Sequence, residues 1–189
     1  MIAKSNFTSR IRQRYYHLTC QQSAVDYKTD QIHEKGKRND SANKKLVKQL
    51  KVMKDQIVDE LLHQAHYEAF EEINCLTCAN CCKTTSPVFT EKDIERIAGL
   101  LKMRPGNFSS TYLFRDDEGD MVLKSSPCAF LQPDNTCSIY SQRPAACRNY
   151  PHTDRKKVRQ LLDLTLRNTM ICPAVQEIFD SIRKRLNIG

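Results

Sequence analysis

The chain has 189 residues, enough for one domain of ordinary size and a tail of a few dozen residues. It is 40% hydrophobic and 28% charged, with a mean hydropathy of −0.59. No apolar run reaches the roughly 18 residues of a membrane-spanning helix, which excludes an integral membrane protein. Nine cysteines are many for a cytosolic enzyme, yet no apolar signal core precedes them. We therefore expect a cytoplasmic protein whose cysteines bind metal instead of forming disulfides.

Most of the net charge of +8 lies near the N-terminus, where residues 1–50 contain 11 Lys and Arg against 4 Asp and Glu. The segment 1–43 shows no sustained helical or strand period and includes the linker-like stretch 36–41. We therefore predict a basic, disordered tail over 1–43, in which Cys20 stands apart. The domain itself is predicted to span 44–189.

Two amphipathic helices are predicted in the first half of the domain. The first covers 44–73, where no Pro or Gly interrupts the apolar stripe, and it also carries His63 and His66 as expected surface or boundary residues. Its stripe is Leu46, Leu50, Met53, Ile57, Leu61, Ala65, Ala69 and Ile73. The second begins at Thr90, with Asp93 in a variant of the capping box. Its buried stripe should be Ile94, Ile97, Ala98 and Leu101.

The remaining elements are shorter. Pro105 should open a third helix with Phe108 and Tyr112 facing inward. Segments 113–115 and 121–124 flank an acidic stretch without the ligand spacing of an EF-hand, which predicts a β-hairpin with a solvated turn. A last helix follows Pro173 and should pack against the first. The predicted fold class is mainly α: a small helical domain with irregular cysteine-rich metal-binding loops and one short β-hairpin.

Eight cysteines lie between positions 75 and 172, and four of them form the pattern CxxCxxCC. Two intervening residues allow both thiolates to face one centre while backbone amides hydrogen-bond the sulfurs, which is why CxxC recurs in zinc and iron sites. The spacing predicts metal binding without deciding between an iron–sulfur cluster and zinc. The predicted ligands are Cys75, Cys78, Cys81, Cys82, Cys128, Cys137, Cys147 and Cys172.

Eight thiolates divide naturally into two four-ligand sites, although a single site stays open as an alternative. The adjacent side chains of Cys81 and Cys82 should diverge and serve different centres. A CxxCxxC segment with a remote Cys-Pro is similar to the ferredoxin pattern, which suggests one partition. The first site would take Cys75, Cys78, Cys81 and Cys172. The second would take Cys82, Cys128, Cys137 and Cys147.

A filled four-thiolate site carries about two negative charges, so cations are expected nearby. Lys83, Arg143 and Arg148 lie within a few residues of predicted ligands. The positive N-terminal end of the last helix lies at Cys172. These groups are predicted to offset the charge of the bound metals.

Groups for an enzymatic reaction are few. The sequence has neither a nucleotide-binding glycine motif nor the CxxxCxxC pattern of radical-SAM enzymes. His152 is the strongest candidate for a further ligand or an acid–base group, whereas Tyr140 and Tyr150 suit packing with a hydrogen-bonding tip. Whether the protein is an enzyme therefore stays open.

The cysteine-bearing segments resemble those of the YkgJ-type cysteine-cluster family. The resemblance rests on residues 75–83, 137–140, 143–151 and 172–173, and it covers roughly 44–188. It implies a bacterial, cytoplasmic domain with eight cysteines that chelates zinc or iron, and a similar cysteine pattern is attached to a flagellin lysine methylase. It implies no particular reaction.

Three functions are compatible with these features. The ferredoxin-like spacing favours an iron–sulfur protein with a redox or electron-transfer role. The alternatives are a zinc-stabilised protein-interaction module and a metal-dependent protein-modifying enzyme or its accessory. Each implies an unidentified protein partner. A nucleic-acid partner is a weaker alternative, based on the tail and the basic run 155–159, and no membrane partner is expected.

Overall fold

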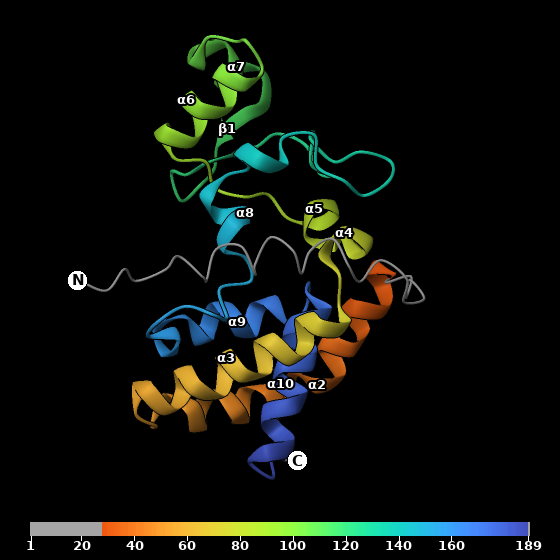
Figure 1. Cartoon of the computed structure of the whole chain (residues 1–189), viewed down its shortest axis with the longest axis vertical. Helices are drawn as coiled ribbons and strands as arrows, with labels where there is room; N and C mark the ends of the chain where they lie inside the picture. Colours follow the sequence, from red (N-terminus) through yellow and green to blue (C-terminus); the bar gives the residue numbers. More distant parts are fainter. Residues whose placement is uncertain (1–27, 189) are drawn as a thin grey trace, which may run out of the picture.

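The computed structural model describes residues 28–188, and the predictions for residues 1–27, including Cys20, lie outside this range. The described chain forms a larger helical bundle and a smaller lobe, each with its own hydrophobic core (Figure 1). A single two-stranded sheet accompanies the helices within residues 28–188. The predicted mainly α fold class is therefore confirmed. Between residues 28 and 188, no helix combines the length and apolarity needed to cross a membrane.

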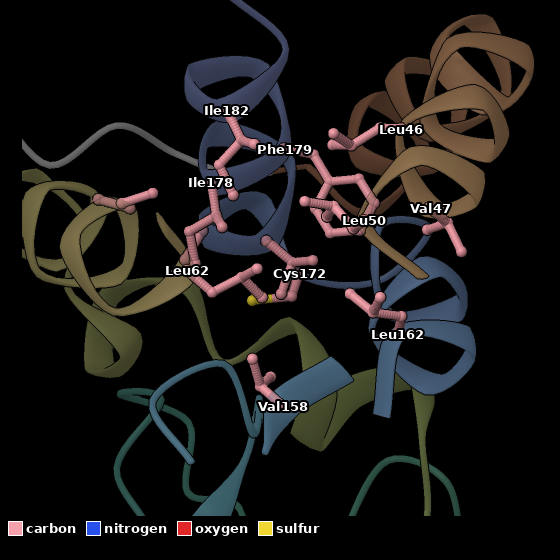
Figure 2. Close-up of a cluster of buried hydrophobic side chains, with 14 of the residues drawn as sticks. Leu46, Val47, Leu50, Leu62, Val158, Leu162, Cys172, Ile178, Phe179 and Ile182 are labelled. Carbon is pink, nitrogen blue, oxygen red and sulfur yellow. The ribbon is translucent and has the colours of Figure 1, made fainter. Parts of the chain in front are cut away.

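The larger bundle consists of four helices and one 3-10 turn. These are α2 (Thr29–Lys51), α3 (Asp55–Glu72), η2 (Val158–Leu161), α9 (Leu162–Asn168) and α10 (Pro173–Arg185). The last helix packs mainly against α3 and also contacts α2. Its side chains Val175, Ile178, Phe179 and Ile182 are fully buried, each contributing about 1.5–3 kcal/mol (Figure 2). The predicted packing of the last helix on the first is confirmed.

Helix α2 begins well before residue 44, so the prediction of a disordered tail is wrong for residues 28–43. Ile32 is buried, and Gly36 brings the helix into close contact with Met170. The buried Gln176 Nε2 donates a hydrogen bond to the carbonyl of Ile32 at 2.7 Å. These contacts involve backbone and a glycine, so they leave no apolar periodicity in the sequence.

The single helix predicted over 44–73 is in fact two helices, α2 and α3. The chain turns at Val52, which is 86% exposed. After this turn Val58 and Leu62 are fully buried, whereas Ile57 is 43% exposed. The predicted stripe is therefore displaced by one residue in the first half of α3, whereas the predicted Ala65, Ala69 and Ile73 are buried. The reason is that the turn reverses the chain, and α3 faces α10 instead of continuing the buried face of α2.

The smaller lobe contains α6 (Glu91–Leu100) and α7 (Pro105–Tyr112). Thr90 and Asp93 form the predicted capping box, in which each side chain accepts a hydrogen bond from the other's backbone N–H at 3.2 Å. Ile97 and Phe108 are fully buried in the core of this lobe. Both helices therefore confirm their predicted starts and inward faces.

A hairpin completes the smaller lobe, with β1 (Leu113–Arg115) pairing antiparallel to β2 (Met121–Leu123) in the register Leu113 to Leu123. The Asp116 carboxylate accepts two backbone N–H groups of the turn, as in an ordinary solvated turn. The Phe89 N–H donates to the Met121 carbonyl at 2.8 Å. The segment that follows the CxxCxxCC pattern is thereby fastened to the hairpin.

The remaining short helices carry or flank cysteines. They are α4 (Cys75–Cys78), α5 (Asn80–Thr84), η1 (Tyr140–Gln142) and α8 (Ala145–Asn149). Figure 1 places α4, α5 and α8 between the bundle and the smaller lobe. The cysteines therefore gather where the two hydrophobic cores adjoin.

Candidate metal centre

All eight cysteines between positions 75 and 172 are free thiols. Four lie in the adjoining helices α4 and α5, Cys147 lies in α8, and Cys172 is the N-cap of α10. Cys128 and Cys137 lie in the loops between β2 and η1 and contact the core of the smaller lobe. The expectation that these cysteines do not form disulfides is confirmed for the described residues.

The CxxCxxCC segment is folded into two one-turn helices by local interactions. The Asn74 side chain caps α4 by accepting the Leu76 N–H at 2.9 Å. Ala79 adopts a left-handed conformation with φ 46°, which ends α4 and starts α5. Lys83 Nζ donates to the Cys78 carbonyl at 3.2 Å across this turn. These interactions fix the two turns that carry Cys75 and Cys78 in α4 and Cys81 and Cys82 in α5.

Asn80, between the second and third cysteines, anchors this segment to the bundle. Its side chain is buried, and its Nδ2 donates to the carbonyl of Ile171 at 2.7 Å. Its Oδ1 accepts the hydroxyl of Thr29 at 2.7 Å. Ile171 directly precedes Cys172. Asn80 therefore holds the CxxCxxCC segment against the segment of Cys172, about 90 residues further along the chain.

The first group of cysteines lines one small cavity of about 30 Å³ beside the bundle core. Its members are Cys75, Cys78, Cys81 and Cys172. The other lining side chains are mainly apolar, among them Phe70 and Ile73, and Tyr150 also faces this cavity. Four thiols from three separate turns of the chain thus line one small cavity.

The surroundings of these thiols favour the protonated form. Burial raises the pKa of the Cys172 thiol to about 12, although the backbone N–H groups of Val175 and Ala174 act in the opposite direction. Cys75 is exposed as a residue, but protein atoms around its thiol, followed by the thiols of Cys78 and Cys82, raise its pKa to about 11. Binding a metal here would therefore release protons.

The second group consists of cysteines that meet beside the smaller lobe. Its members are Cys82, Cys128, Cys137 and Cys147. The Cys128 N–H donates to the Cys82 carbonyl at 2.8 Å, and the Phe130 N–H donates to the Cys128 sulfur at 3.5 Å. Burial, followed by the thiols of the other three members, raises the pKa of Cys147 to about 12. Cys82 also raises the pKa values of Cys75 and Cys78, so it lies near both groups. The assignment of ligands to two sites stays a prediction.

Cys81 and Cys82 are not separated by diverging side chains as expected. The thiol of Cys81 is the largest cause of the raised pKa of Cys82, ahead of burial, so the two thiols lie side by side. What distinguishes them is their neighbours. Cys81 lines the cavity with Cys172, and Cys82 bonds through its backbone to Cys128. The boundary between the groups therefore runs through this dipeptide.

The donor chemistry of both groups fits a thiophilic metal, but the thiols do not yet converge. Among residues 28–188, no three His, Cys, Asp or Glu side chains are placed to hold one ion as they stand. The raised pKa values of Cys75 and Cys172 favour their protonated forms. Eight free thiols at the junction of two cores, with four around one small cavity, fit zinc or an iron–sulfur cluster.

Arg143 lies near members of both groups. Its guanidinium stacks on the Tyr140 ring at 3.9 Å and donates to the Tyr140 carbonyl at 2.9 Å. Its positive charge acts against the raised pKa values of Cys75, Cys137 and Cys147. Arg143 is thus placed to offset negative charge on either group, as predicted for the cations near the cysteines.

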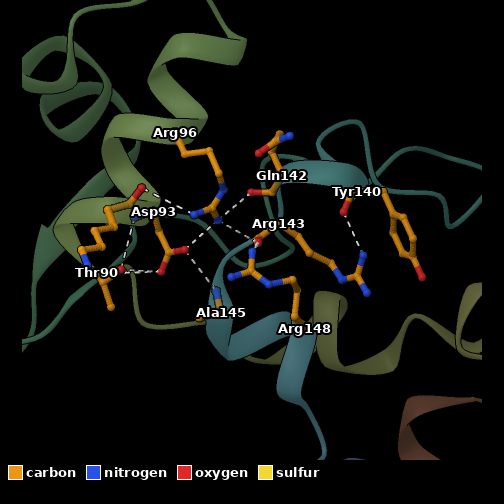
Figure 3. A network of polar contacts seen from close by, with 9 residues as sticks. Thr90, Asp93, Arg96, Tyr140, Gln142, Arg143, Ala145 and Arg148 are labelled. Carbon is orange, nitrogen blue, oxygen red and sulfur yellow. Dashed lines mark hydrogen bonds and ion pairs between the residues drawn. The ribbon is translucent and has the colours of Figure 1, made fainter. Parts of the chain in front are cut away.

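A buried carboxylate positions the segment that carries Cys147, and only its part in the capping box was predictable from the sequence. Asp93 accepts the Ala145 N–H at 3.2 Å and the Arg96 guanidinium at 2.7 Å (Figure 3). Arg96 also donates to the carbonyls of Gln142 and Arg143 at 3.1 Å each. Burial opposes ionisation of Asp93, but Arg96 and its other donors lower its pKa overall. This network joins α6 to the start of α8.

The histidines have structural partners or lie beside the cysteines. His63 Nε2 contacts the carbonyl of Arg155 at 3.0 Å, and His66 Nδ1 contacts the hydroxyl of Thr153 at 2.8 Å. Both agree with the boundary role expected from sequence. His152 packs edge-on to Tyr150 with ring centroids 6.3 Å apart, and burial is the main cause that lowers its pKa. His152 Nδ1 is buried without a hydrogen-bond partner.

Comparison with known proteins identifies the family of the chain. Residues 74–171 match the family described as "CxxCxxCC: Putative zinc- or iron-chelating domain". An uncharacterized protein of Methanocaldococcus jannaschii, MJ0661, is 32% identical over 83 residues, which cover 42% of this chain and 44% of that relative. No solved structure matches the chain significantly. The predicted metals, iron–sulfur or zinc, agree with the description of the family, and the chain belongs to the CxxCxxCC zinc- or iron-chelating domain family.

Proposed function

We propose that this protein holds two four-thiolate iron–sulfur centres and exchanges electrons with a protein partner. The observation that carries the proposal is the small cavity lined by four cysteines from distant parts of the chain. The first centre would be held by Cys75, Cys78, Cys81 and Cys172. The second would be held by Cys82, Cys128, Cys137 and Cys147. When bound, such clusters supply one-electron redox chemistry.

The ferredoxin-like spacing favours a cluster over a single ion. Cys75, Cys78 and Cys81 form CxxCxxC, and Cys172 is followed by Pro173, as in the ferredoxin pattern. The cavity between these thiols measures about 30 Å³, close to the volume of one water molecule, so binding a cluster would move the cysteine-bearing turns apart.

The chain's own residues would exclude water and balance charge. Phe70 and Ile73 cover the first centre from the bundle side. Backbone N–H groups at the start of α10 point at the Cys172 sulfur, which stabilises its thiolate. Arg143 supplies a positive charge that reaches both groups. The closeness of the groups at the dipeptide 81–82 suits electron exchange between two centres.

The test is to purify the full chain without oxygen and measure iron, acid-labile sulfide and zinc per chain, together with the visible and electron paramagnetic resonance spectra. We expect iron and sulfide at two clusters per chain. Serine variants then separate the centres: Cys81→Ser should lose the same signal as Cys172→Ser, and Cys82→Ser the same signal as Cys147→Ser. Cys20→Ser is the matched control and should keep both signals.

Two results would contradict the proposal. Zinc without iron or sulfide in the anaerobic protein would remove the redox role. One signal lost identically in all eight cysteine variants would replace two centres by one. A different grouping of the variants would keep two centres and overturn only the assignment of ligands.

A zinc-stabilised interaction module is the second candidate, and exposed apolar side chains support it. Leu76 is 42% exposed within α4, and Tyr140 is 44% exposed in η1, next to Arg143. Metal binding would hold both segments rigid and present these side chains to a partner protein. Stoichiometric zinc, together with loss of partner capture in a Leu76→Ser and Tyr140→Ser double variant, would favour this function over electron transfer.

We further propose that the protein works in the cytoplasm. Eight free thiols persist and bind metal most readily in a reducing compartment. Cell fractionation of the tagged full chain tests this. Recovery from an oxidising compartment with the cysteines joined in disulfides would overturn it.

A further inference from the structure

Tyr150 follows α8 and brings a phenol group to the wall of the first cysteine cavity. It packs against the bundle core, and it shares the cavity lining with Cys172 and the three other thiols of the first group. Its hydroxyl oxygen is buried and has no hydrogen-bond partner among the described residues. A buried phenol without a partner loses its bonds to water and normally destabilises the fold.

The polar groups around the cavity leave this hydroxyl unmatched. The Asn80 amide also lines the cavity, but its oxygen and its nitrogen are already bonded to Thr29 and to the Ile171 carbonyl. Phe70 and Ile73 offer no acceptor. What remains near the hydroxyl is sulfur: among the thiols, Cys172 acts on the phenol most strongly, through its charge and through a side-chain contact that falls short of a regular hydrogen bond.

The acceptor strength of that sulfur depends on its state. A neutral thiol accepts hydrogen bonds only weakly, which explains why the hydroxyl has no proper partner here. A metal-bound thiolate carries negative charge and accepts a hydrogen bond well. Groups that hydrogen-bond to metal ligands orient them and adjust the electronic properties of the metal.

We propose that Tyr150 donates a hydrogen bond to the Cys172 thiolate when the first centre is filled, and so positions and tunes this ligand. The inference rests on the proposed function, since it requires a metal at that centre. It assigns a functional role to a residue that sequence reasoning treated as packing. It also explains why a buried polar group lacks a partner in this structure.

The test compares Tyr150→Phe, which removes only the oxygen, with Tyr112→Phe as control. Tyr112 lies in the other core, with its ring 5.2 Å from Phe108 and 5.1 Å from Phe130. The full chain is freed of metal and titrated with Co²⁺ alone, whose thiolate charge-transfer bands report the sulfur ligands. Thermal unfolding of each metal-free variant is measured in parallel.

We expect Tyr150→Phe to bind Co²⁺ at the first centre roughly 10–100-fold more weakly, with its charge-transfer bands moved to longer wavelength. The metal-free variant should be at least as stable as the parent, because an unpartnered hydroxyl has been removed. Tyr112→Phe should keep the affinity and the spectrum of the parent. Serine at Cys172 should abolish the difference between Tyr and Phe at position 150.

Two outcomes would overturn the inference while leaving the metal site intact. One is a Tyr150→Phe protein with the same Co²⁺ affinity and spectrum as the parent. The other is an equal loss of stability with and without metal, which would mean that the hydroxyl is only structural. Failure of the proposed function shows separately, as the absence of iron and acid-labile sulfide from the anaerobic protein, so the two failures are distinguishable.

Discussion

Replacing Gly36 by Ala should destabilise the protein, although Ala is normally the better helix former. At an unobstructed helical position this substitution stabilises by about 0.5–1 kcal/mol. Gly36, however, lies in the part of α2 that contacts the turn before α10. A methyl group on it would lie 2.8 Å from the Thr169 carbonyl oxygen and 2.8 Å from the Met170 sulfur.

The size of the effect follows from which neighbour can move. The Met170 side chain is flexible, but the Thr169 carbonyl is backbone and also accepts a hydrogen bond from the buried Gln176 amide at 2.7 Å. Overpacking of this kind costs about 1–3 kcal/mol. After the gain in helix propensity is subtracted, the net loss is at most about 2.5 kcal/mol and near 1 kcal/mol at the middle of these ranges, which lowers the melting temperature by up to roughly 10 °C.

The assay is chemical and thermal unfolding of the full-length parent and variant under identical metal loading. Gly99→Ala is the control, because Gly99 is also helical but has no atom within 4 Å of the added methyl group. We expect it to be neutral or stabilising by up to about 1 kcal/mol. If Gly36→Ala proved as stable as Gly99→Ala, the described seating of α2 against the turn before Cys172 would be wrong.

Three further outcomes are expected. Asp93→Asn should lower the free energy of unfolding by about 2–3 kcal/mol, measured with denaturant, and deplete metal first at the proposed centre that includes Cys147. Equal depletion of both proposed centres would contradict a local role for the hydrogen bonds that Asp93 accepts from Arg96 and Ala145. In metal-free protein the raised pKa of Cys172 means that the folded state keeps a proton that the unfolded chain loses. The contribution of this thiol to the free energy of unfolding should be constant below pH 9.0 and fall by up to about 4 kcal/mol as the pH rises toward 12. Urea midpoints that do not change over this range would refute the raised pKa of Cys172. Chelation should speed hydrogen exchange in 75–89 and 125–153 more than in α3 and α10, because the apolar bundle does not depend on thiolates; uniform acceleration would contradict this.

Elements with strong local signals were predictable from the sequence. The capping box at Thr90 and the prolines at positions 105 and 173 start helices where expected, because each satisfies or avoids the unpaired N–H groups of a helix start. The first half of α2 was not predictable in this way. Its burial depends on a glycine and on the side chain of Gln176, which come from parts of the chain far apart in sequence.

The cysteine site shows the same division between local and distant causes. CxxC spacing predicted that the thiols gather, since two residues suffice to turn the chain back on itself. By contrast, Cys81 and Cys82 belong to different groups because Cys81 shares a cavity with Cys172 and Cys82 is hydrogen-bonded through its backbone to Cys128. A single sequence does not show which of these distant cysteines lies near which member of the pair. Likewise, the contact of Asp93 with the Ala145 N–H spans 52 positions and is visible only in the fold.

The position of Cys172 at the N-cap of α10 has a consequence for biosynthesis. During translation all four cysteines of the second group have been made once Cys147 is added. The first group is completed only by Cys172, which is made just before the helix that fills the centre of the bundle. Synthesis of the first group of thiols therefore ends as closing of the bundle begins, and a ribosome paused before this helix would carry a chain with all four cysteines of the second group and three of the first.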